Sequence, residues 1–391
     1  MNKPAGSYER SILSVPPILI LILFRSHALR GNAVLDALRR TFGIFFVEGE
    51  LRFMATILSI PVLVVLFSQN LVAGSDAGFS SEKAGFSVKF KNEVSPYRVI
   101  GVFVLPEETL TLQVLDKGKK RRYHLQTATG KVTQIKANKW HWQAPLETGL
   151  YTVKIIHSQS LDDMTFNIFV MFPHDQLKGE YLNGYRIGEY PTVPLKQLPI
   201  YEPPSGFIEV TKANEETLVA PHFKLKQFLC KQEGNYPKYV VLRERLLLKL
   251  ELILEKTNEQ GYRCNTFHIM SGYRTPCYNK AIGNVTYSRH VWGDATDIFI
   301  DENPKDGNMD DLNHDGELDY QDAAILYNII NNIDDMYGEP SDKSFVGGLG
   351  MYEKTAYHGP FVHVDVRGFR ARWGIELLPE RLRGEYVQGD R

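Results

Sequence analysis

The chain has 391 residues, of which 43% are hydrophobic and 23% are charged. This length leaves room for two or three domains with sizeable hydrophobic cores. The formal net charge of -1 argues against a general nucleic-acid-binding protein, because contacts with phosphate groups require an excess of Lys and Arg. We therefore expect no nucleic-acid partner.

Two apolar stretches, at 12–24 and 55–67, lie near the N-terminus. The first is short for a membrane span and contains two prolines. The second follows basic residues and precedes the small residues of VAGSDAG, an order typical of an export signal. We therefore predict that 1–75 is an export signal, with a membrane anchor as the alternative and Met54 as an alternative start. The remainder is expected to be periplasmic or secreted.

Residues 76–175 alternate between apolar runs of strand length and turn residues, for example RVIGVFVL, TLTLQVLD and TFNIFVMF. The pattern predicts an all-β domain, an immunoglobulin-like sandwich. Trp140 and Trp142 share one face of a strand, where either core packing or sugar stacking is open to them. His141 is expected to point to the other face, toward solvent.

One compact basic run, Lys117–Arg122, lies between two of these strands. We interpret it as a solvated hairpin turn, with contact to an anionic polymer or a membrane surface as the alternative.

A segment rich in proline follows at 176–215, and its composition predicts an extended, semi-rigid linker. The prolines that define it are Pro191, Pro194, Pro199, Pro203 and Pro204. Beyond the linker, residues 241–261 are strong helix formers with leucines on a broad face, and they end at a glycine. A second helix is expected near 322–338. Helices mixed with short strands predict an α+β domain over 216–375, followed by a polar tail at 376–391.

Three cysteines, Cys230, Cys264 and Cys277, are too few for a disulfide-stabilised scaffold. They also lack the Cys-x-x-Cys spacing of a zinc site. An oxidising compartment permits one disulfide bond, but the sequence does not select the pair.

His290, Asp297 and His363 each lie beside an apolar run of strand length, which would hold their backbones rigid. Histidine and carboxylate side chains are the usual ligands of catalytic zinc. In FVHVDVR, His363 and Asp365 are two residues apart and therefore share one strand face, opposite the valines. A histidine on a strand is more often a hydrogen-bonded core or surface residue, and this alternative stays open for each residue taken alone.

Three segments together, SGYRTPCYN, SRHVWGDATDI and GLGMY with FVHVDVRG, resemble the signature segments of the zinc D-Ala-D-Ala carboxypeptidase family. That family shares its fold with murein endopeptidases and the hedgehog domain. The resemblance covers roughly residues 220–370. The family pattern S-x-H-x-x-G-x-A-x-D is matched at Ser288, His290, Gly293, Ala295 and Asp297.

The resemblance implies that His290, Asp297 and His363 hold Zn²⁺. It also implies that Arg274 binds a carboxylate or carbonyl group of a peptide substrate, for which its planar guanidinium is suited. The alternative for Arg274 is a surface salt bridge. Ser288 either orients a ligand or the substrate, or caps a turn.

The chain departs from the family at the general base. Pro360 stands where many members have a glutamate, and Phe361 stands where others have a histidine. We therefore expect Asp365 to act as the base or to orient His363, and His358 to steady the tetrahedral intermediate.

The stretch DLNHDGELDYQD, at 311–322, has the spacing of an EF-hand calcium loop, and its exit resembles that of dockerin-type loops. A solvated acidic turn is the alternative. We expect Ca²⁺ there to order a segment at the edge of the cleft. The residues expected to bind it are Asp311, Asn313, Asp315, Glu317 through its carbonyl, Asp319 and Asp322.

Taken together, these features predict a zinc peptidase that hydrolyses D-amino-acid-containing stem peptides of peptidoglycan, as a carboxypeptidase or an endopeptidase. One alternative is a non-catalytic binding module that retains zinc. Another is an adhesin or structural protein with calcium-stabilised domains.

Overall fold

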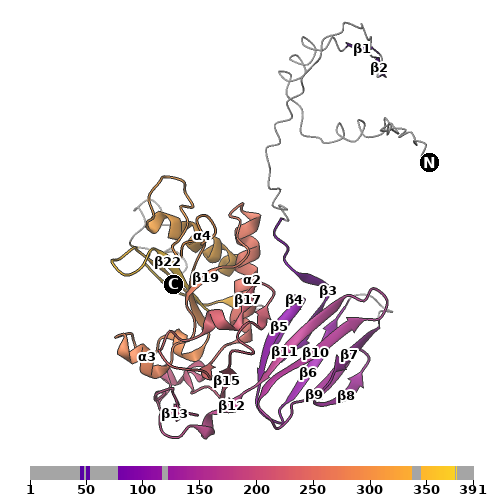
Figure 1. Cartoon of the computed structure of the whole chain (residues 1–391), viewed down its shortest axis with the longest axis vertical. Coiled ribbons are helices and arrows are strands. Elements are labelled where there is room, and N and C mark those ends of the chain that lie inside the picture. Colours follow the sequence, from indigo (N-terminus) through magenta and orange to yellow (C-terminus); the bar gives the residue numbers. More distant parts are fainter. Residues whose placement is uncertain are drawn as a thin grey trace, which may run out of the picture. The chain divides into compact units, whose positions relative to one another are not determined.

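The structure, a computed structural model, describes residues 45–47, 50–52, 78–116, 122–336, 345–374 and 376 (Figure 1). The chain divides into two compact units, Met1–Ser75 and Asp76–Arg391. In the first unit, β1 (Phe45–Val47) pairs with β2 (Glu50–Arg52) in antiparallel orientation.

Several predictions fall on residues outside the described ranges. They are most of the export signal or anchor at 1–75, including Met54, the basic residues 117–121 and nearly all of the polar tail. Within the described ranges, no helix combines the length and the apolar character needed to cross a membrane.

Residues 83–170 form two β-sheets. The five-stranded sheet has the order β4 (Glu93–Tyr97), β3 (Lys83–Phe90), β6 (Thr109–Leu115), β9 (Lys139–Gln143) and β8 (Lys131–Lys136). The four-stranded sheet has the order β5 (Val99–Val104), β11 (Asp163–Val170), β10 (Gly149–His157) and β7 (Tyr123–Thr127).

Aromatic side chains join the two sheets into a sandwich. The ring centroids of Phe90 and Phe166, one from each sheet, are 5.8 Å apart. Trp140 and Trp142 are both buried, so core packing is confirmed and sugar stacking by these two side chains is wrong. His141 lies between them on the opposite face of β9 and is partly exposed. The immunoglobulin type of this sandwich stays a prediction.

The proline-rich segment 176–215 is folded, and the prediction of an extended linker is wrong. Tyr190 and Tyr201 within it are buried, and the Tyr190 hydroxyl donates to the carbonyl oxygen of Val291 at 3.1 Å. Trp292 in turn donates from its indole to the Glu202 carbonyl oxygen at 2.8 Å. Proline content suggested stiffness, but aromatic side chains beside the prolines anchor the segment to Val291 and Trp292, within the motif SRHVWGDATDI of the C-terminal domain.

Short elements complete this segment and the connection to the C-terminal domain. They are β12 (Phe172–Pro173), η3 (His174–Gln176), β13 (Tyr181–Leu182), β14 (Tyr185–Arg186), η4 (Leu195–Gln197), η5 (Pro199–Tyr201), β15 (Gly206–Val210), β16 (Leu218–Ala220), β17 (Phe223–Lys224), η6 (Leu225–Phe228) and β18 (Lys238–Val240). Strand β15 pairs with both β12 and β18.

The C-terminal domain combines helices with a five-stranded sheet, as an α+β domain does. The sheet has the order β19 (His268–Ser271), β20 (Ala295–Phe299), β22 (Phe361–Asp365), β21 (Gly348–Tyr352) and β23 (Ala371–Trp373). All its pairs are antiparallel except β21 with β23. The helical elements are α2 (Glu244–Glu259), α3 (Pro276–Ala281), η7 (Arg289–Trp292) and α4 (Tyr320–Met336).

Both long helices lie close to their predicted positions. Helix α2 begins three residues later than the predicted 241–261, because Arg243 before it has an extended backbone. Helix α4 packs against β21 and β22. The valines of β22, Val362 and Val364, are fully buried, so one face of this sheet belongs to the core.

Helix α2 also contacts the β-sandwich. Its first residue, Glu244, is buried and accepts hydrogen bonds from the Phe103 backbone amide at 3.0 Å and from Lys91 Nζ at 2.7 Å. The next residue, Arg245, forms an ion pair with Glu93 at 2.8 Å. Strands β4 and β5 of the sandwich are therefore held to the N-terminal turn of α2 by charged hydrogen bonds.

Candidate metal centre

Five residues form one row across the C-terminal sheet. The register pairs Ser271 with Asp297, Asp297 with His363, His363 with Gly350, and Gly350 with Trp373. Residues opposite each other on neighbouring strands point to the same face of a sheet. The face opposite the buried valines thus carries two candidate metal ligands side by side.

The third candidate ligand, His290, comes from η7, the short helix before β20. Gly293 ends that helix with a φ of 68°, and a Cβ atom there would overlap the Val241 backbone. The glycine of the sequence motif is therefore required both for the left-handed turn and for the close approach of the two backbones. The turn carries His290 back over β20.

Three atoms of these residues meet at one point. His290 Nε2 lies 3.2 Å from Asp297 Oδ1 and 3.2 Å from His363 Nδ1, and the latter two atoms are 2.9 Å apart. Ligands about 2.0–2.1 Å from a tetrahedral zinc ion are separated by roughly 3.3 Å. The triangle of ligand atoms therefore has nearly the dimensions of one face of a tetrahedral zinc site. Among the described residues, no other group of three His, Cys, Asp or Glu side chains lies close enough to share a metal ion.

Hydrogen bonds fix which nitrogen each histidine presents. His290 Nδ1 lies 2.7 Å from the Gly272 carbonyl oxygen, which only a protonated nitrogen can satisfy, so Nε2 is left with its lone pair. His363 Nε2 lies 3.2 Å from Asp365 Oδ2, so Nδ1 faces the other ligands. Such outer partners orient a metal-binding histidine and make it a better electron donor.

Burial and neighbouring charges favour the metal-binding forms of Asp297 and His290, but they favour the protonated form of His363. Burial alone would raise the pKa of Asp297, but the neighbouring His290 and His363 lower it below the ordinary range. Burial lowers the pKa of His290 and favours the neutral ring. Burial also acts to lower the pKa of His363, but Asp297 and Asp365 outweigh it and raise that pKa. A proton on His363 therefore competes with a cation, and the competition grows as the pH falls.

Asp365 is predicted to be either a base or the residue that orients His363, and its surroundings support orientation. It is fully buried, and besides His363 it accepts hydrogen bonds from the Gly348 amide at 2.7 Å and from Arg367 Nε at 2.9 Å. Burial acts to raise its pKa, but His363 and Arg367 hold that pKa well below its usual range. A carboxylate that is buried, ionised and already bonded on both oxygens is poorly placed to take a proton from a substrate complex.

Two glycines of the GLGMY segment make room for this arrangement. A Cβ atom at Gly348 would overlap the Asp365 carboxylate, and one at Gly350 would overlap the indole of Trp373. The Trp373 ring lies 5.1 Å from the His363 ring. The space beside these two glycines of β21 is thus occupied by the side chains of Asp365 and Trp373, which flank His363.

Arg274 lies at the centre rather than on the surface. It is buried, and its Nη2 donates to Asp297 Oδ2 at 2.6 Å while its Nε donates to Ser271 Oγ at 2.8 Å. The surface salt bridge considered from the sequence is therefore wrong, because the ion-paired carboxylate is a buried candidate ligand. Binding of a substrate by Arg274 stays a prediction.

Ser288 and His358 are less closely tied to the triad. Ser288 is the residue before η7, and its side chain makes no capping hydrogen bond, so side-chain capping is wrong. The His358 ring lies 2.8 Å from the Gly359 carbonyl oxygen through Nδ1 and 5.0 Å from the Phe361 ring. Neither contact connects His358 to the candidate ligands, and its role stays a prediction.

Tyr352 and Trp373 also lie at the metal face, and neither is predicted from the sequence. Tyr352 follows Gly350 by two residues and so shares its face of β21, and its hydroxyl oxygen accepts a hydrogen bond from Trp373 Nε1 at 3.0 Å. The residue is 37% exposed, so part of it is accessible to a ligand. Burial of its ring and the charge of Asp297 raise its pKa, so the phenol stays protonated near neutral pH. The spacing of two residues between Gly350 and Tyr352 in GLGMY could have predicted that both lie on the same strand face.

The predicted calcium loop is ordered by its own side chains. Asp311 Oδ2 accepts from the Gly316 amide at 2.9 Å, and Asp322 accepts from the Leu312 amide at 2.8 Å and the Asp319 amide at 3.0 Å. Its carboxylates do not form a shared three-ligand group of the kind seen at the triad. The structure therefore leaves calcium binding untested.

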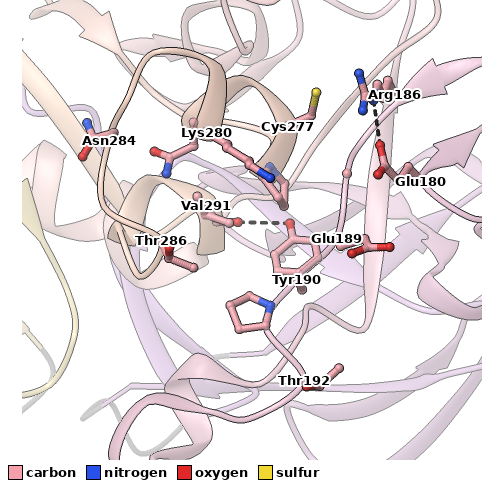
Figure 2. Close-up of a pocket in the computed structure, with 14 residues that line it drawn as sticks. Glu180, Arg186, Glu189, Tyr190, Thr192, Cys277, Lys280, Asn284, Thr286 and Val291 are labelled. Carbon is pink, nitrogen blue, oxygen red and sulfur yellow. Dashed lines mark hydrogen bonds and ion pairs between the residues drawn. The ribbon is translucent and has the colours of Figure 1, made fainter.

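A pocket of about 510 Å³ lies beside α3, where residues 186–192 pack against that helix (Figure 2). Figure 2 shows the Tyr190 hydroxyl bonded to Val291 and the ion pair between Arg186 and Glu180 at another part of the wall. None of the three candidate ligands lines this pocket. It is therefore separate from the metal face, although Val291 directly follows His290.

A comparison with protein families matches part of the C-terminal domain. Residues 221–315 match the family described as Peptidase M15. This part of the chain resembles a metallopeptidase. Peptidases of this family depend on zinc, in agreement with the His–Asp–His triangle. The matched segment contains His290 and Asp297 but ends before His363. The pairing of β20 with β22 places His363 beside Asp297. The search of curated proteins found no match for the chain.

An Asp365→Asn variant is expected to bind zinc about 10- to 100-fold more weakly, because the amide cannot hold the His363 ring as the carboxylate does. Zinc affinity would be measured by competition with a chromogenic chelator. Asp163→Asn, in the sandwich, is the matched control and should bind zinc as the native chain does. Equal affinities for all three proteins would contradict the orienting role of Asp365.

Proposed function

We propose that the chain is a zinc-dependent peptidase that hydrolyses D-amino-acid-containing stem peptides of peptidoglycan outside the cytoplasm. The observation that carries the proposal is the triangle of His290, Asp297 and His363, with 2.9–3.2 Å between ligand atoms, in a domain that matches Peptidase M15. Three protein ligands leave one position of a tetrahedral zinc ion for water or substrate. Zinc held there would polarise a peptide carbonyl and activate water.

Arg274 is suited to position the peptide. Its contacts within the described residues use Nε and Nη2, which leaves Nη1 to donate to a carbonyl or carboxylate of the substrate. The bonds to Ser271 and Asp297 hold the guanidinium plane in place before the substrate arrives. A preorganised donor loses less conformational entropy on binding than a free side chain does.

Tyr352 is suited to stabilise negative charge on the substrate oxygen. Its oxygen accepts from Trp373, so its own O–H hydrogen is available to a ligand. Its raised pKa keeps that hydrogen in place near neutral pH. A donor fixed before the reaction stabilises developing charge more effectively than mobile water does. We assign this role to Tyr352 in place of the one expected for His358.

A second candidate function is a zinc-containing binding module without catalytic activity. Pro360 and Phe361 occupy the positions where family members carry a proton acceptor, and the carboxylate of Asp365 is buried and fully bonded. This alternative keeps the metal but predicts no turnover.

We further propose that 311–322 binds Ca²⁺ and thereby orders the segment between Asp297 and His363. Asp311 Oδ1 is buried without a hydrogen-bond partner within the described residues. Burial and the neighbouring charge of Asp311 raise the pKa of Asp322, although backbone amides oppose this. A hard cation would relieve both the unpaired oxygen and the repulsion between the two carboxylates.

The peptidase proposal is tested by digesting purified peptidoglycan with residues 76–391, with and without a chelator, and identifying products by mass spectrometry. Free D-Ala would identify a carboxypeptidase, and conversion of crosslinked dimers to monomers would identify an endopeptidase. Either activity should disappear with the chelator and return with zinc. Folded, zinc-loaded protein that releases no product would favour the binding module instead.

A Tyr352→Phe variant is expected to lower kcat about 10²-fold with little change in KM, because the lost hydrogen bond acts on the transition state. Zinc content should be unchanged. Tyr357→Phe, at a side chain that is 96% exposed, is the control and should retain the native kcat. A native kcat for Tyr352→Phe would rule out the donor role.

Calcium at 100 times its dissociation constant is expected to stabilise the chain by about 2.7 kcal/mol and to raise its thermal midpoint. The midpoint would be measured by calorimetry with calcium and with a calcium-selective chelator. Asp315→Ala should abolish the shift, because it removes a side-chain ligand from the exposed part of the loop. Identical midpoints for the calcium-free and calcium-loaded native chain would mean that the loop is a solvated acidic turn.

A further inference from the structure

The outward face of the five-stranded sheet of the sandwich is mainly polar. Strands β3, β6, β9 and β8 lie side by side in Figure 1. Their inward positions hold core residues such as Val88, Leu112, Trp140 and Trp142. The alternation of strand residues places the intervening positions on the opposite face.

The register assembles those outward positions into rows. Lys89 pairs with Gln113 and Gln113 with Lys139. A register shift in β8 between Gln134 and Lys136 brings Lys136 opposite Lys139, so three lysines lie on one line across four strands. Neighbouring strands are about 4.8 Å apart, so this lysine row is roughly 14 Å long. The next rows hold Thr111, His141 and Thr133, and then Thr109, Gln143 and Lys131.

No carboxylate offsets this positive charge on the face itself. The outward positions of β3, β6, β9 and β8 carry no Asp or Glu. The ion pairs within the described residues do not include Lys89, Lys131, Lys136 or Lys139. Strand β8 is an edge strand and is exposed along its whole length, which keeps its lysines accessible.

The sequence around these strands has the same bias. Residues 117–146 contain eight Lys or Arg and no Asp or Glu, although the whole chain has a formal net charge of -1. Positive charge is therefore concentrated in this part of the sequence, and the compensating negative charge lies elsewhere in the chain. Segregation of this kind creates a local field that attracts polyanions.

We propose that this face, with Lys89, Lys131, Lys136 and Lys139 as its cations, binds a linear anionic polysaccharide. A row of lysines complements anionic groups spaced along a chain, and the threonine, glutamine and histidine side chains between them can hydrogen-bond to sugar hydroxyls. Single-stranded nucleic acid is less well matched, because base stacking needs exposed aromatic side chains and both tryptophans of β9 are in the core. The proposal is independent of the metal centre.

The test compares two triple variants of the whole chain with equal changes in charge. Lys89→Gln, Lys136→Gln and Lys139→Gln together remove the lysine row. Lys178→Gln, Lys231→Gln and Lys354→Gln together remove three exposed lysines outside the sandwich. Binding to polygalacturonate would be measured by calorimetry over a series of salt concentrations, with dextran as the neutral polymer. Thermal midpoint and zinc content would show that each variant is folded.

We expect the native chain to bind polygalacturonate but not dextran, with an affinity that falls as salt rises. Loss of the lysine row should weaken binding about tenfold or more, whereas the control variant should bind within about twofold of the native chain. Equal weakening in both variants, or no binding by the native chain, would overturn the proposal. Binding only to phosphatidylglycerol vesicles, or only to single-stranded DNA, would also overturn it in favour of a membrane or a nucleic acid. Peptidase activity does not enter this test, so its outcome is separate from that of the proposed function.

Discussion

The antiparallel pairing of β20 with β22 is the constraint on which the metal centre depends. It places Asp297 directly beside His363, while alternate residues of the same strands are buried in the core. A shift of β22 by one residue would turn His363 into the core and Val362 and Val364 toward the face that carries Asp297. The apolar packing of one face therefore determines the chemistry of the other.

The charged groups on this face compensate each other in pairs. Arg274 accompanies Asp297, and Arg367 accompanies Asp365, and both carboxylates are buried. Buried ions are costly unless they are paired and hydrogen-bonded. Removal of either arginine would leave an uncompensated carboxylate next to a histidine of the triad, so these residues support the fold as well as the site.

The sequence predicted the three candidate ligands that the structure brings together, but it did not predict their surroundings. The spacing of His290 and Asp297 and the alternation around His363 were visible in the chain, and the family resemblance connected them. Trp373 could not be placed in this way, because it reaches the site through β23, beyond the last motif. The proline-rich segment was misread since proline content describes the stiffness of a chain but not the tertiary contacts of Tyr190 and Tyr201.

The contact of α2 with the sandwich has a consequence for how the chain would act on an extended target. Glu244 accepts hydrogen bonds from the Phe103 amide and from Lys91 Nζ, and these bonds hold the sandwich against helix α2 of the C-terminal domain. Two binding surfaces joined by such a contact, rather than by a flexible tether, have a fixed separation. Effective concentration is then high for groups that match this separation and low for all others. If both proposals hold, the chain would favour cell-wall material in which the anionic groups and the peptide bond to be cut are separated by this distance.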